Sequence, residues 1–282
     1  MLDPQLTLNC NGRLLSLDRP RIMGIININD NSFYAGSRYD SVDAVLKTAQ
    51  EMLDAGADIL DLGAMSTRPG AETISAASEQ QRLLPVLKAL KNTYPEAIIS
   101  VDTVYADTAR KAAAAGAGMI NDVSAGSMDP ELFPALAELG LPYVLMHMRG
   151  RPKDMQKDVR YDNLLTDVYD FLAERHAQLT TSGVNDVIID PGFGFGKSLE
   201  DNYRLLANLG VFRAFNRPVL CGISRKSMIW RALGTDPAWA LNGTSVLHLK
   251  ALQEGAAILR AHDVKEARQV VRLHSLLEEN RS

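Results

Sequence analysis

The segment from Asp190 to Lys197 has the residue types of a binding site for a flat polar ligand. It follows the apolar run 187–189, which predicts a buried parallel strand that ends on the Asp190 carboxylate. A carboxylate accepts two parallel hydrogen bonds from an N–H/NH2 edge. Three glycines let the backbone approach a ligand closely, and Phe193 and Phe195 offer rings on which it could lie. The alternative is that Asp190 caps the next helix.

Polar side chains also stand at the ends of the other apolar runs in the chain. They are Asn27, Asp61, Asp102, Asn121, Asp122, His147, Ser224 to Ser227, Arg260 and His262. A buried strand gains no stability from such groups, because each one must find a partner. A ring of them contributed by nearly all strands is therefore better explained by a ligand.

Several of these residues have a chemistry that suits a heterocycle carrying phosphate. Asn121 has both a donor and an acceptor, and Lys226 can donate to a ring carbonyl or nitrogen. Arg260 and His262 alternate along one strand, so both point the same way and could clamp a phosphate. The alternatives are a solvated surface lysine and a histidine bonded to backbone in the core.

The loop 65–70 brings two hydroxyls and a guanidinium onto one short connection. It could be a lid over a site, or an ordinary capped loop.

Apolar runs alternate with segments of helical period along the chain. The expected strands are 21–27, 57–63, 97–103, 119–123, 142–148, 186–190, 218–224 and 257–262. The expected helices are 41–55, 74–94, 105–115, 130–139, 163–182, 199–214, 241–254 and 264–279. This pattern predicts an α/β fold, a (β/α)8 TIM barrel, whose active site would lie at the C-terminal ends of the strands. A doubly wound open sheet is the alternative.

The first residues form a separate pattern. Residues 6–19 alternate around Asn11-Gly12, which predicts a β-hairpin. We expect a single domain, 1–282, in which the hairpin extension, 1–20, covers the bottom of the barrel.

Composition bounds the class of protein. The chain has 282 residues, 46% hydrophobic and 23% charged, which is typical of a soluble globular protein with a large core. Its net charge of −4 argues against nucleic acid as a partner, and no apolar run is long enough to cross a membrane. Cys10 and Cys221 are far apart, so we expect reduced thiols in a cytoplasmic protein without a signal peptide.

Taken together and in order, these stretches resemble the dihydropteroate synthase family over nearly the whole chain. The markers are Met23 to Asn27, Ser66 to Gly70, Ser100 to Thr103, Ile120 to Asp122, Met146 to Met148, Asp190 to Lys197, Ser224 to Ser227, and Arg260 with His262 and Asp263. The resemblance implies a homodimeric barrel that joins 7,8-dihydropterin-6-ylmethyl diphosphate to 4-aminobenzoate with Mg²⁺. The products would be 7,8-dihydropteroate and pyrophosphate, in folate biosynthesis, and sulfonamides would be inhibitors.

The resemblance also implies roles for individual residues. The pterin would be held by Asp102, Asn121, Asp190 and Lys226, with Met146 lining its pocket. The diphosphate would be held by Asn27, Arg260 and His262, and Asn27 would also reach the metal. The aminobenzoate site would be framed by Thr67, Arg68, Pro69, Phe195, Lys226 and Ser227. In that scheme Asp102 stabilises the cation left on the pterin methylene when diphosphate departs, so Asn27, Asp102, Lys226, Arg260 and His262 are the expected catalytic residues.

Two loops depart from the family pattern. Asn29-Asp30-Asn31 stands where the family commonly has Thr-Pro-Asp, and Ala64-Met65 stands where it usually has Gly-Glu. Two rival functions therefore stay open: a pterin-binding paralogue without catalysis, and a pterin-dependent methyltransferase domain.

Overall fold

Eight parallel strands form the centre of the molecule. The computed structural model describes residues 7–28, 38–65, 73–150 and 160–281, and of residues 38–41 only the backbone. The strands are β3 (Arg21–Asn27), β4 (Ile59–Gly63), β5 (Ile98–Asp102), β6 (Met119–Asp122), β7 (Tyr143–Met146), β8 (Val187–Asp190), β9 (Leu220–Cys221) and β10 (Ile258–Ala261). Each of the eight predicted runs contains one of them. Their order is β8-β7-β6-β5-β4-β3-β10-β9, which follows the chain all the way round.

The two edges of this sheet meet, so the sheet curls into a barrel. Ile189 of β8 bridges in parallel to Val219, the residue before β9, and its amide donates to the Pro218 carbonyl at 2.9 Å. An open doubly wound sheet would reverse its strand order at a switch point. No reversal occurs among the strands described, so the predicted (β/α)8 barrel is confirmed and the open sheet is wrong.

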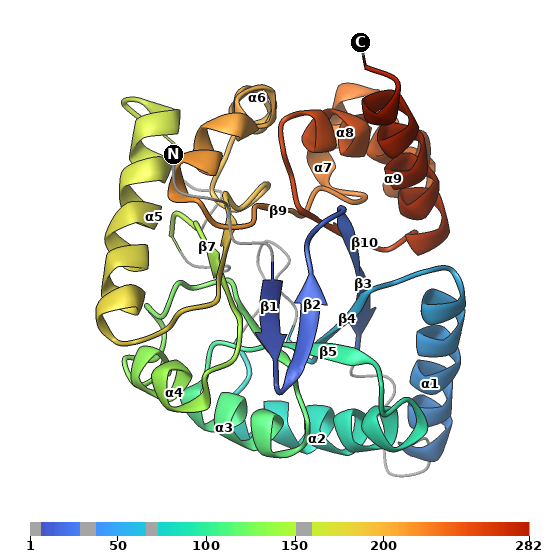
Figure 1. The fold of residues 1–282 in the computed structure, drawn as a ribbon, viewed down its shortest axis with the longest axis vertical. Helices are drawn as coiled ribbons and strands as arrows, with labels where there is room; N and C mark the ends of the chain where they lie inside the picture. The colour runs from blue at the N-terminus through green and yellow to red at the C-terminus, as the bar shows by residue number, and fades with distance from the viewer. Residues whose placement is uncertain (1–6, 29–37, 66–72, 151–159, 282) are drawn as a thin grey trace.

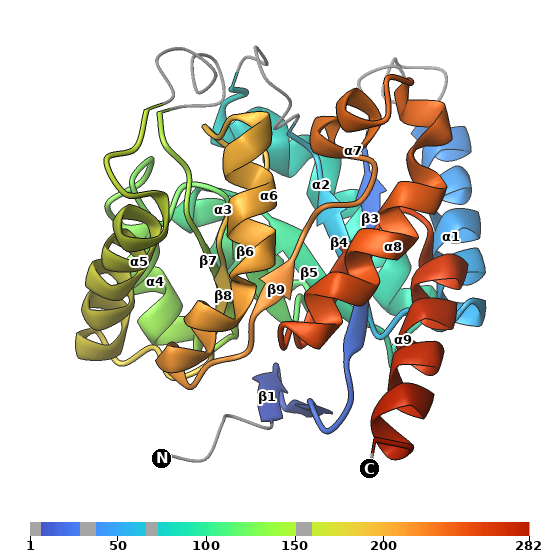
Figure 2. The ribbon, with the colours of Figure 1, turned by 90° about the horizontal axis from the view of Figure 1, so that it is seen from above.

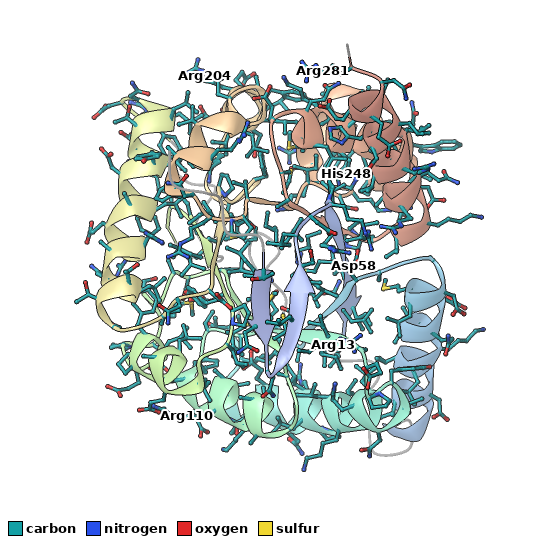
Figure 3. The ribbon with its side chains drawn as sticks, in the orientation of Figure 1. Arg13, Asp58, Arg110, Arg204, His248 and Arg281 are labelled. Atoms are coloured by element: carbon teal, nitrogen blue, oxygen red, sulfur yellow. The ribbon has the colours of Figure 1, made fainter. Side chains whose placement is uncertain are left out.

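Helices surround the barrel, one after each strand (Figure 1). They are α1 (Arg38–Asp54), α2 (Ala76–Thr93), α3 (Ala106–Ala114), α4 (Leu132–Leu139), α5 (Leu164–Thr181), α6 (Leu199–Ala207), α8 (Ala240–Gln253) and α9 (Val264–Glu279). Their inner faces pack on the outward side chains of the strands, such as Ile22, Leu60 and Ile99, in one large apolar cluster. Charged residues such as Arg110 of α3 and Arg204 of α6 lie at the periphery of the molecule, on the side of the helices away from the barrel (Figure 3).

The predicted helix 199–214 is not one helix. It divides into α6 and the 3-10 helix η2 (Leu209–Phe215). Two short elements between β9 and α8 were not predicted: α7 (Ser227–Ala232) and the 3-10 helix η3 (Pro237–Trp239). Six and three residues are too few to show a helical period, which explains why the sequence pattern missed them.

The N-terminal residues form the predicted hairpin. Its strands β1 (Thr7–Cys10) and β2 (Arg13–Ser16) are antiparallel, and Cys10 pairs with Arg13. The two turn residues, Asn11 and Gly12, have φ of 54° and 84°. Positive φ at both positions matches the right-handed twist of the strands, which is why Asn-Gly is favoured there.

The hairpin covers the N-terminal end of the barrel (Figure 2). Its buried side chains Leu8, Cys10 and Leu15 pack on an inward-facing layer that most strands supply from their first two residues. That layer consists of Met23, Ile59, Ile98, Met119, Val144, Ile188, Leu220 and Ile258. The predicted position of the hairpin is confirmed, and the inside of the barrel at this end is filled by an apolar plug.

One further property follows from the helices. In the parts of the chain that the structure describes, no helix combines the length and the apolar character needed to cross a membrane.

Candidate active site

Polar side chains fill the other end of the barrel. Successive side chains of a strand alternate between its two faces, so residues two positions beyond the apolar plug again point inward. That inward layer is Ile25, Asp61, Ser100, Asn121, Met146, Asp190, Gly222 and Arg260. Along most strands the inward residue is therefore apolar in the plug and polar two positions later. This change marks the boundary between the plug and the site.

Within this layer the Arg260 guanidinium pairs with the Asp61 carboxylate, and it also reaches Asp102, two residues beyond Ser100 on β5. Arg260 donates from Nε to Asp61 Oδ2 at 2.7 Å and from Nη2 to Asp102 Oδ2 at 3.5 Å. Asn121 Nδ2 donates to the same Asp61 oxygen at 3.0 Å. Asp61 was noted in the polar ring of the sequence but given no role, and here it fixes both Arg260 and Asn121.

Asp102 is a carboxyl group under electrostatic strain. Burial, followed by the charge of Asp61, raises its pKa to about 8, while Arg260 acts in the opposite direction. The Oδ1 atoms of Asp61 and Asp102 are both buried and have no hydrogen-bond partner among the described residues. Buried polar atoms normally have partners. Two such oxygens beside one guanidinium therefore point to a ligand that supplies donors.

Asp190 lies at the end of β8 and is also buried. Its Oδ1 accepts a hydrogen bond from the Gly192 amide at 2.8 Å, and burial raises its pKa although Lys226 opposes the shift. The alternative role as a helix cap is wrong, because Ser198 caps α6 in a reciprocal capping box with Asp201. Asp190 is thus held inside the barrel by its own loop.

The segment 191–197, called here the glycine–phenylalanine loop, contacts Lys226. Lys226 Nζ donates to the Phe193 carbonyl at 2.6 Å and lies 4.7 Å from the centre of the Phe195 ring. Burial lowers the pKa of Lys226 to about 8, and Asp190 opposes that shift. The alternative of a solvated surface lysine is therefore wrong.

The residues around Lys226 orient it. Arg225 has a positive φ of 54°, and its guanidinium makes a two-point ion pair with Asp263 at 2.7 and 2.8 Å. This turn directs Arg225 toward Asp263, and Ser227 begins α7 directly after Lys226. The sequence motif Ser224 to Ser227 is thus a turn that presents one lysine.

His262 lies at the mouth of the barrel, directly after the end of β10, the strand that carries Arg260. Its backbone amide and its Nδ1 both lie 3.1 Å from Ser224 Oγ. Desolvation and then Arg260 lower its pKa to about 4, so the imidazole is neutral at neutral pH. The core alternative is wrong, because the residue as a whole is exposed and its ring meets the Ser224 hydroxyl and not a backbone group. Arg260 itself points into the acid pair, so the expected two-residue clamp is only partly assembled in this structure.

An apolar wall adjoins these polar groups. Buried Met65, Val104, Val123, Met146 and Phe195 pack together in one cluster. Met146 and Phe195 were expected in the site, whereas Met65 was noted only as a departure from the family pattern. Its burial in this wall is compatible with the absence of the acid that the family usually has there.

Two other buried groups were missed by the sequence analysis. Glu79, in the first turn of α2, accepts a hydrogen bond from Thr103 Oγ1 at 2.6 Å, directly behind Asp102. Lys197 Nζ lies 2.9 Å from His147 Nδ1. For Lys197 and His147, the signals were the motif that ends at Lys197 and the place of His147 among the polar residues at the strand ends. Glu79 gave no signal, because it is an acid within a helical segment.

Some expected residues cannot be placed. Thr67, Arg68 and Pro69, and the altered segment Asn29-Asp30-Asn31, lie outside the described residues. Asn27 is exposed at the end of β3, in register with Gly63 of β4, which is in turn in register with Asp102 of β5.

A cavity of about 630 Å³ lies at the opposite end of the barrel, beside the hairpin and the last turns of α1 and α2. Figure 3 looks onto this end and labels Arg13 and Asp58, which both line the cavity. Its charged groups pair among themselves, as in Arg13 with Glu96 and Arg21 with Asp58. It therefore lacks the unpaired polar atoms that mark the other end.

The fold and the site define a class of protein. The chain, whose barrel presents acids, an amide and two cations at one end, matches the family model described as pterin binding enzyme over residues 23–262. The chain belongs to this family of pterin binding enzymes.

Individual relatives narrow the class. The dihydropteroate synthase of Escherichia coli (strain K12) is 42% identical over 264 residues, which is 93% of both chains. That of Haemophilus influenzae is 40% identical over 259 residues, which is 91% of this chain and 94% of the relative. The crystal structure of the Yersinia pestis dihydropteroate synthase with a sulfonamide drug complex has a TM-score of 0.90 at 39% identity, over 98% of this chain and 100% of that one. Within the pterin binding enzymes, the chain is thus one of the dihydropteroate synthases, which are transferases.

Proposed function

We propose that the chain condenses 7,8-dihydropterin-6-ylmethyl diphosphate with 4-aminobenzoate to give 7,8-dihydropteroate and pyrophosphate, a step of folate biosynthesis. The observation that carries the proposal is the pair of partnerless carboxylate oxygens, of Asp61 and Asp102, beside Arg260 at the C-terminal end of the barrel. Support comes from the dihydropteroate synthase of Xanthomonas albilineans, solved in complex with 7,8-dihydropteroate. It has a TM-score of 0.85 at 36% identity, over 97% of this chain and 99% of that one.

The pterin would lie across the inward layer. Asp190 would accept from the N–H/NH2 edge of the ring through its free acceptor positions, and Asn121 would complement an edge with both donors and acceptors. Lys226 would donate to a ring carbonyl or nitrogen, and Met146 would pack on the ring face. The partnerless oxygen of Asp102 would take a further ring N–H.

The diphosphate would bind at the mouth. Arg260 uses two of its five N–H groups on Asp61 and Asp102, so three are left for phosphate oxygens. His262 would donate from its ring, and a neutral imidazole can gain a proton once the anion arrives. Asn27 would complete this group.

A magnesium ion fits the residues next to the mouth. Asn27 Oδ1 and Asp102 Oδ2 lie 3.9 and 3.7 Å from the place that a Cβ on Gly63 would occupy, so an amide oxygen and a carboxylate oxygen face the same small space. Oxygen ligands of this kind, together with phosphate oxygens, are those that Mg²⁺ takes. We propose that Asn27 holds the ion, which would offset charge on the diphosphate leaving group.

The aminobenzoate would bind on the other side of the pterin methylene. Phe195, Lys226 and Ser227 would frame it, joined by Thr67, Arg68 and Pro69 from the second loop. Sulfonamide drugs would compete for the same place, as a drug of that class is present in the complex of the Yersinia pestis protein.

The chain's own residues would assist the reaction by electrostatics. As the C–O bond to diphosphate breaks, Arg260 and His262 would hold the negative leaving group, and the electron-rich pterin would carry the cation on its methylene. A positive charge beside Asp102 favours its carboxylate form and so lowers the raised pKa. The uncharged arylamine then forms the C–N bond and releases a proton, which requires no strong base.

A coupled assay of pyrophosphate release tests this function directly. The purified protein, Mg²⁺ and both substrates should release pyrophosphate and form 7,8-dihydropteroate in equal amounts. A protein that binds pterin but releases no pyrophosphate would be the binding-only paralogue. Pyrophosphate release that is independent of 4-aminobenzoate would also contradict the proposal.

We further propose a cytoplasmic homodimer that uses no nucleic acid or membrane partner. The neighbouring helices α8 and α9 expose Val246 (60%), Leu273 (60%) and Leu277 (56%), which supports burial of this side against a second copy. The two free, buried cysteines support a reducing compartment. Sedimentation equilibrium of wild type and of Leu273→Glu tests the dimer, since the variant should then shift toward monomer.

A further inference from the structure

Lys197 is a buried cation that the proposed mechanism does not use. Only 3% of its surface is exposed, although it ends the glycine–phenylalanine loop that lines the site. A lysine is rarely buried unless its ammonium is paired, because desolvating a charge is costly. The hydrogen-bond partners of the Lys197 ammonium therefore indicate what role the buried lysine has.

The ammonium of Lys197 is held by acceptors from two separate parts of the chain. From the loop itself it donates to the carbonyls of Gly192 at 2.8 Å and Phe195 at 3.2 Å. From the end of β7 it meets His147 Nδ1 at 2.9 Å and the His147 carbonyl at 3.5 Å. These are all uncharged groups, so Lys197 acts as a link between the loop and the neighbouring strand end rather than as one half of an ion pair.

His147 is suited to accept this bond. Burial and then the charge of Lys197 lower the pKa of His147 to about 2, so its imidazole is neutral and Nδ1 can be the acceptor. Burial lowers the pKa of Lys197 to about 7, and the charge of Asp190 opposes that shift. Burial thus lowers the pKa of both groups.

The loop has little freedom to move away from this link. A Cβ on Gly192, whose φ is +73°, would lie 1.8 Å from the His147 carbonyl oxygen. A Cβ on Gly196 would lie 2.5 Å from the Arg149 carbonyl oxygen. The loop backbone is therefore pressed onto residues 147–149, and Lys197 fastens it there from inside.

The same loop sets the positions of three groups of the proposed site. Gly192 holds Asp190 through its amide, and the Phe193 carbonyl and the Phe195 ring hold Lys226. Of these, Asp190 is also fixed by β8, whereas Phe195, which contacts Lys226, belongs to the loop itself. A change in the loop should thus reach the aminobenzoate side first.

We propose that Lys197 is a positioning residue, whose buried ammonium fastens the glycine–phenylalanine loop so that Phe195 and Lys226 face 4-aminobenzoate. This inference rests on the proposed function for the identity of the ligand. It does not make Lys197 a catalytic residue, because its ammonium is held between the loop carbonyls and His147.

The test uses full-length Lys197→Met and Lys197→Gln. Methionine keeps the apolar stem but removes all donors, whereas glutamine keeps two donors without charge. The matched control is Lys91→Met, because Lys91 likewise donates to two backbone carbonyls, those of Pro95 and Ala97, but near the N-terminal end of the barrel. Steady-state kinetics at saturating pterin diphosphate are combined with calorimetry of 6-hydroxymethyl-7,8-dihydropterin.

Lys197→Met should raise the KM for 4-aminobenzoate about tenfold or more, because several hydrogen bonds from a charged group are lost. Dihydropterin affinity should change less than about threefold, since β6 and β8 still hold Asn121 and Asp190. Lys197→Gln should recover part of the KM, and Lys91→Met should leave both quantities unchanged. Equal losses for both ligands, or no rise of KM in either Lys197 variant, would overturn the proposal.

Hydrogen exchange gives a second measurement that needs no turnover. In Lys197→Gln, and in Lys197→Met if it folds, the amides of Gly194 and Phe195 should exchange about tenfold faster, while that of Ile189 in β8 stays protected. Unchanged exchange in the loop would overturn the proposal whatever the kinetics. If wild type has no synthase activity, the proposed function fails, and the exchange rates still decide whether Lys197 fastens the loop.

Discussion

Asp102 shows how the site is assembled at the expense of stability. Its carboxyl is buried beside a second acid, Asp61, and one oxygen of each has no hydrogen-bond partner among the described residues. A core with apolar residues at these positions would avoid both penalties. The arrangement is therefore explained by what the acids do for a ligand and not by what they contribute to the fold.

Replacing this acid should stabilise the protein in a pH-dependent way. The pKa of Asp102 is about 8 in the folded protein and ordinary in the unfolded chain. Between pH 4 and 8 this residue therefore binds fewer protons in the unfolded chain than in the folded one, and its contribution to wild-type stability falls as pH rises. Asp102→Asn cannot titrate, so its advantage in the free energy of unfolding should grow by about 1 kcal/mol or more from pH 5 to pH 8.

Urea denaturation of both proteins at the two pH values measures this difference. The variant should meanwhile lose synthase activity, because an amide carries no charge to stabilise the cation. A constant stability difference across this range, or a wild type that is the more stable at pH 8, would contradict the role assigned to burial.

Asp190→Asn should weaken pterin binding and leave the fold intact. The amide places donors opposite the donors of the pterin edge and loses a charge-assisted bond, which together cost about 2–4 kcal/mol. Calorimetry with a dihydropterin measures the affinity, and circular dichroism checks the fold. Ser198→Ala, which removes the α6 cap nearby, is the control that should weaken stability but not pterin affinity. Near-normal affinity in Asp190→Asn would place the pterin elsewhere.

At the scale of elements, the loops shape the site more than the strands do. A strand places a side chain at one position, whereas a loop can contact residues that follow several strands. β8 brings Asp190 to the edge of the barrel, but the glycine–phenylalanine loop turns back onto β7 and so reaches Lys226 as well. This return requires backbone that no other residue type adopts easily, with positive φ at Gly192, Gly194 and Gly196.

Gly192→Ala tests this requirement of the loop. An alanine Cβ would fall 1.8 Å from the His147 carbonyl oxygen, so the loop must move off β7. Activity should fall at least about tenfold, because a displacement of this size misplaces Phe195 and Lys226. Gly183→Ala is the matched control: its φ is +91°, but nothing lies within 4 Å of its Cβ.

The control should therefore cost only about 1 kcal/mol of stability and leave kcat/KM unchanged. Chemical denaturation and steady-state kinetics on both variants separate the two effects. Equal activities in Gly192→Ala and Gly183→Ala would mean that the position of the loop does not matter for function.

At the scale of the whole molecule, the two ends of the barrel differ: one is closed by apolar packing, and the other carries the polar layer. The hairpin and the inward apolar layer close the N-terminal end. Substitutions there are therefore expected to lower the free energy of unfolding through lost packing. The polar layer lies at the other end, where Asp61 and Asp102 each have a buried oxygen without a hydrogen-bond partner among the described residues. The proposed ligand site and the apolar plug thus lie at opposite ends of the same eight strands, so the loops at the site can vary without affecting the plug.

We expect substrates to bind in order, with the pterin diphosphate first. The residues proposed for 4-aminobenzoate come from loops after different strands, and a bound pterin would supply one face of their pocket. Calorimetry should detect little binding of 4-aminobenzoate alone, and clear binding when pyrophosphate, Mg²⁺ and a dihydropterin are also present. Tight binding of 4-aminobenzoate to the protein alone would contradict this order.

Much of the barrel was predictable because its signals are local. The alternation of apolar runs with helical segments reflects burial that every strand and helix undergoes separately, so each predicted run contains a strand. Asn11-Gly12 predicts its own turn for the same reason. The short helix α7 and the division between α6 and η2 were missed, because elements of one or two turns are determined by their neighbours rather than by a period of their own.

The sequence by itself thus determined the barrel, the plugged end, and the residue types at the strand ends, since these follow from the periods of strands and helices. Only the tertiary structure decided how those residues pair. It turned Arg260 onto Asp61 and Asp102, buried Met65 in the apolar wall, and fastened the glycine–phenylalanine loop through Lys197 to His147. Such contacts join residues far apart in the chain. Their energies depend on burial and on hydrogen-bond geometry, and neither can be read from the spacing of residues along one strand.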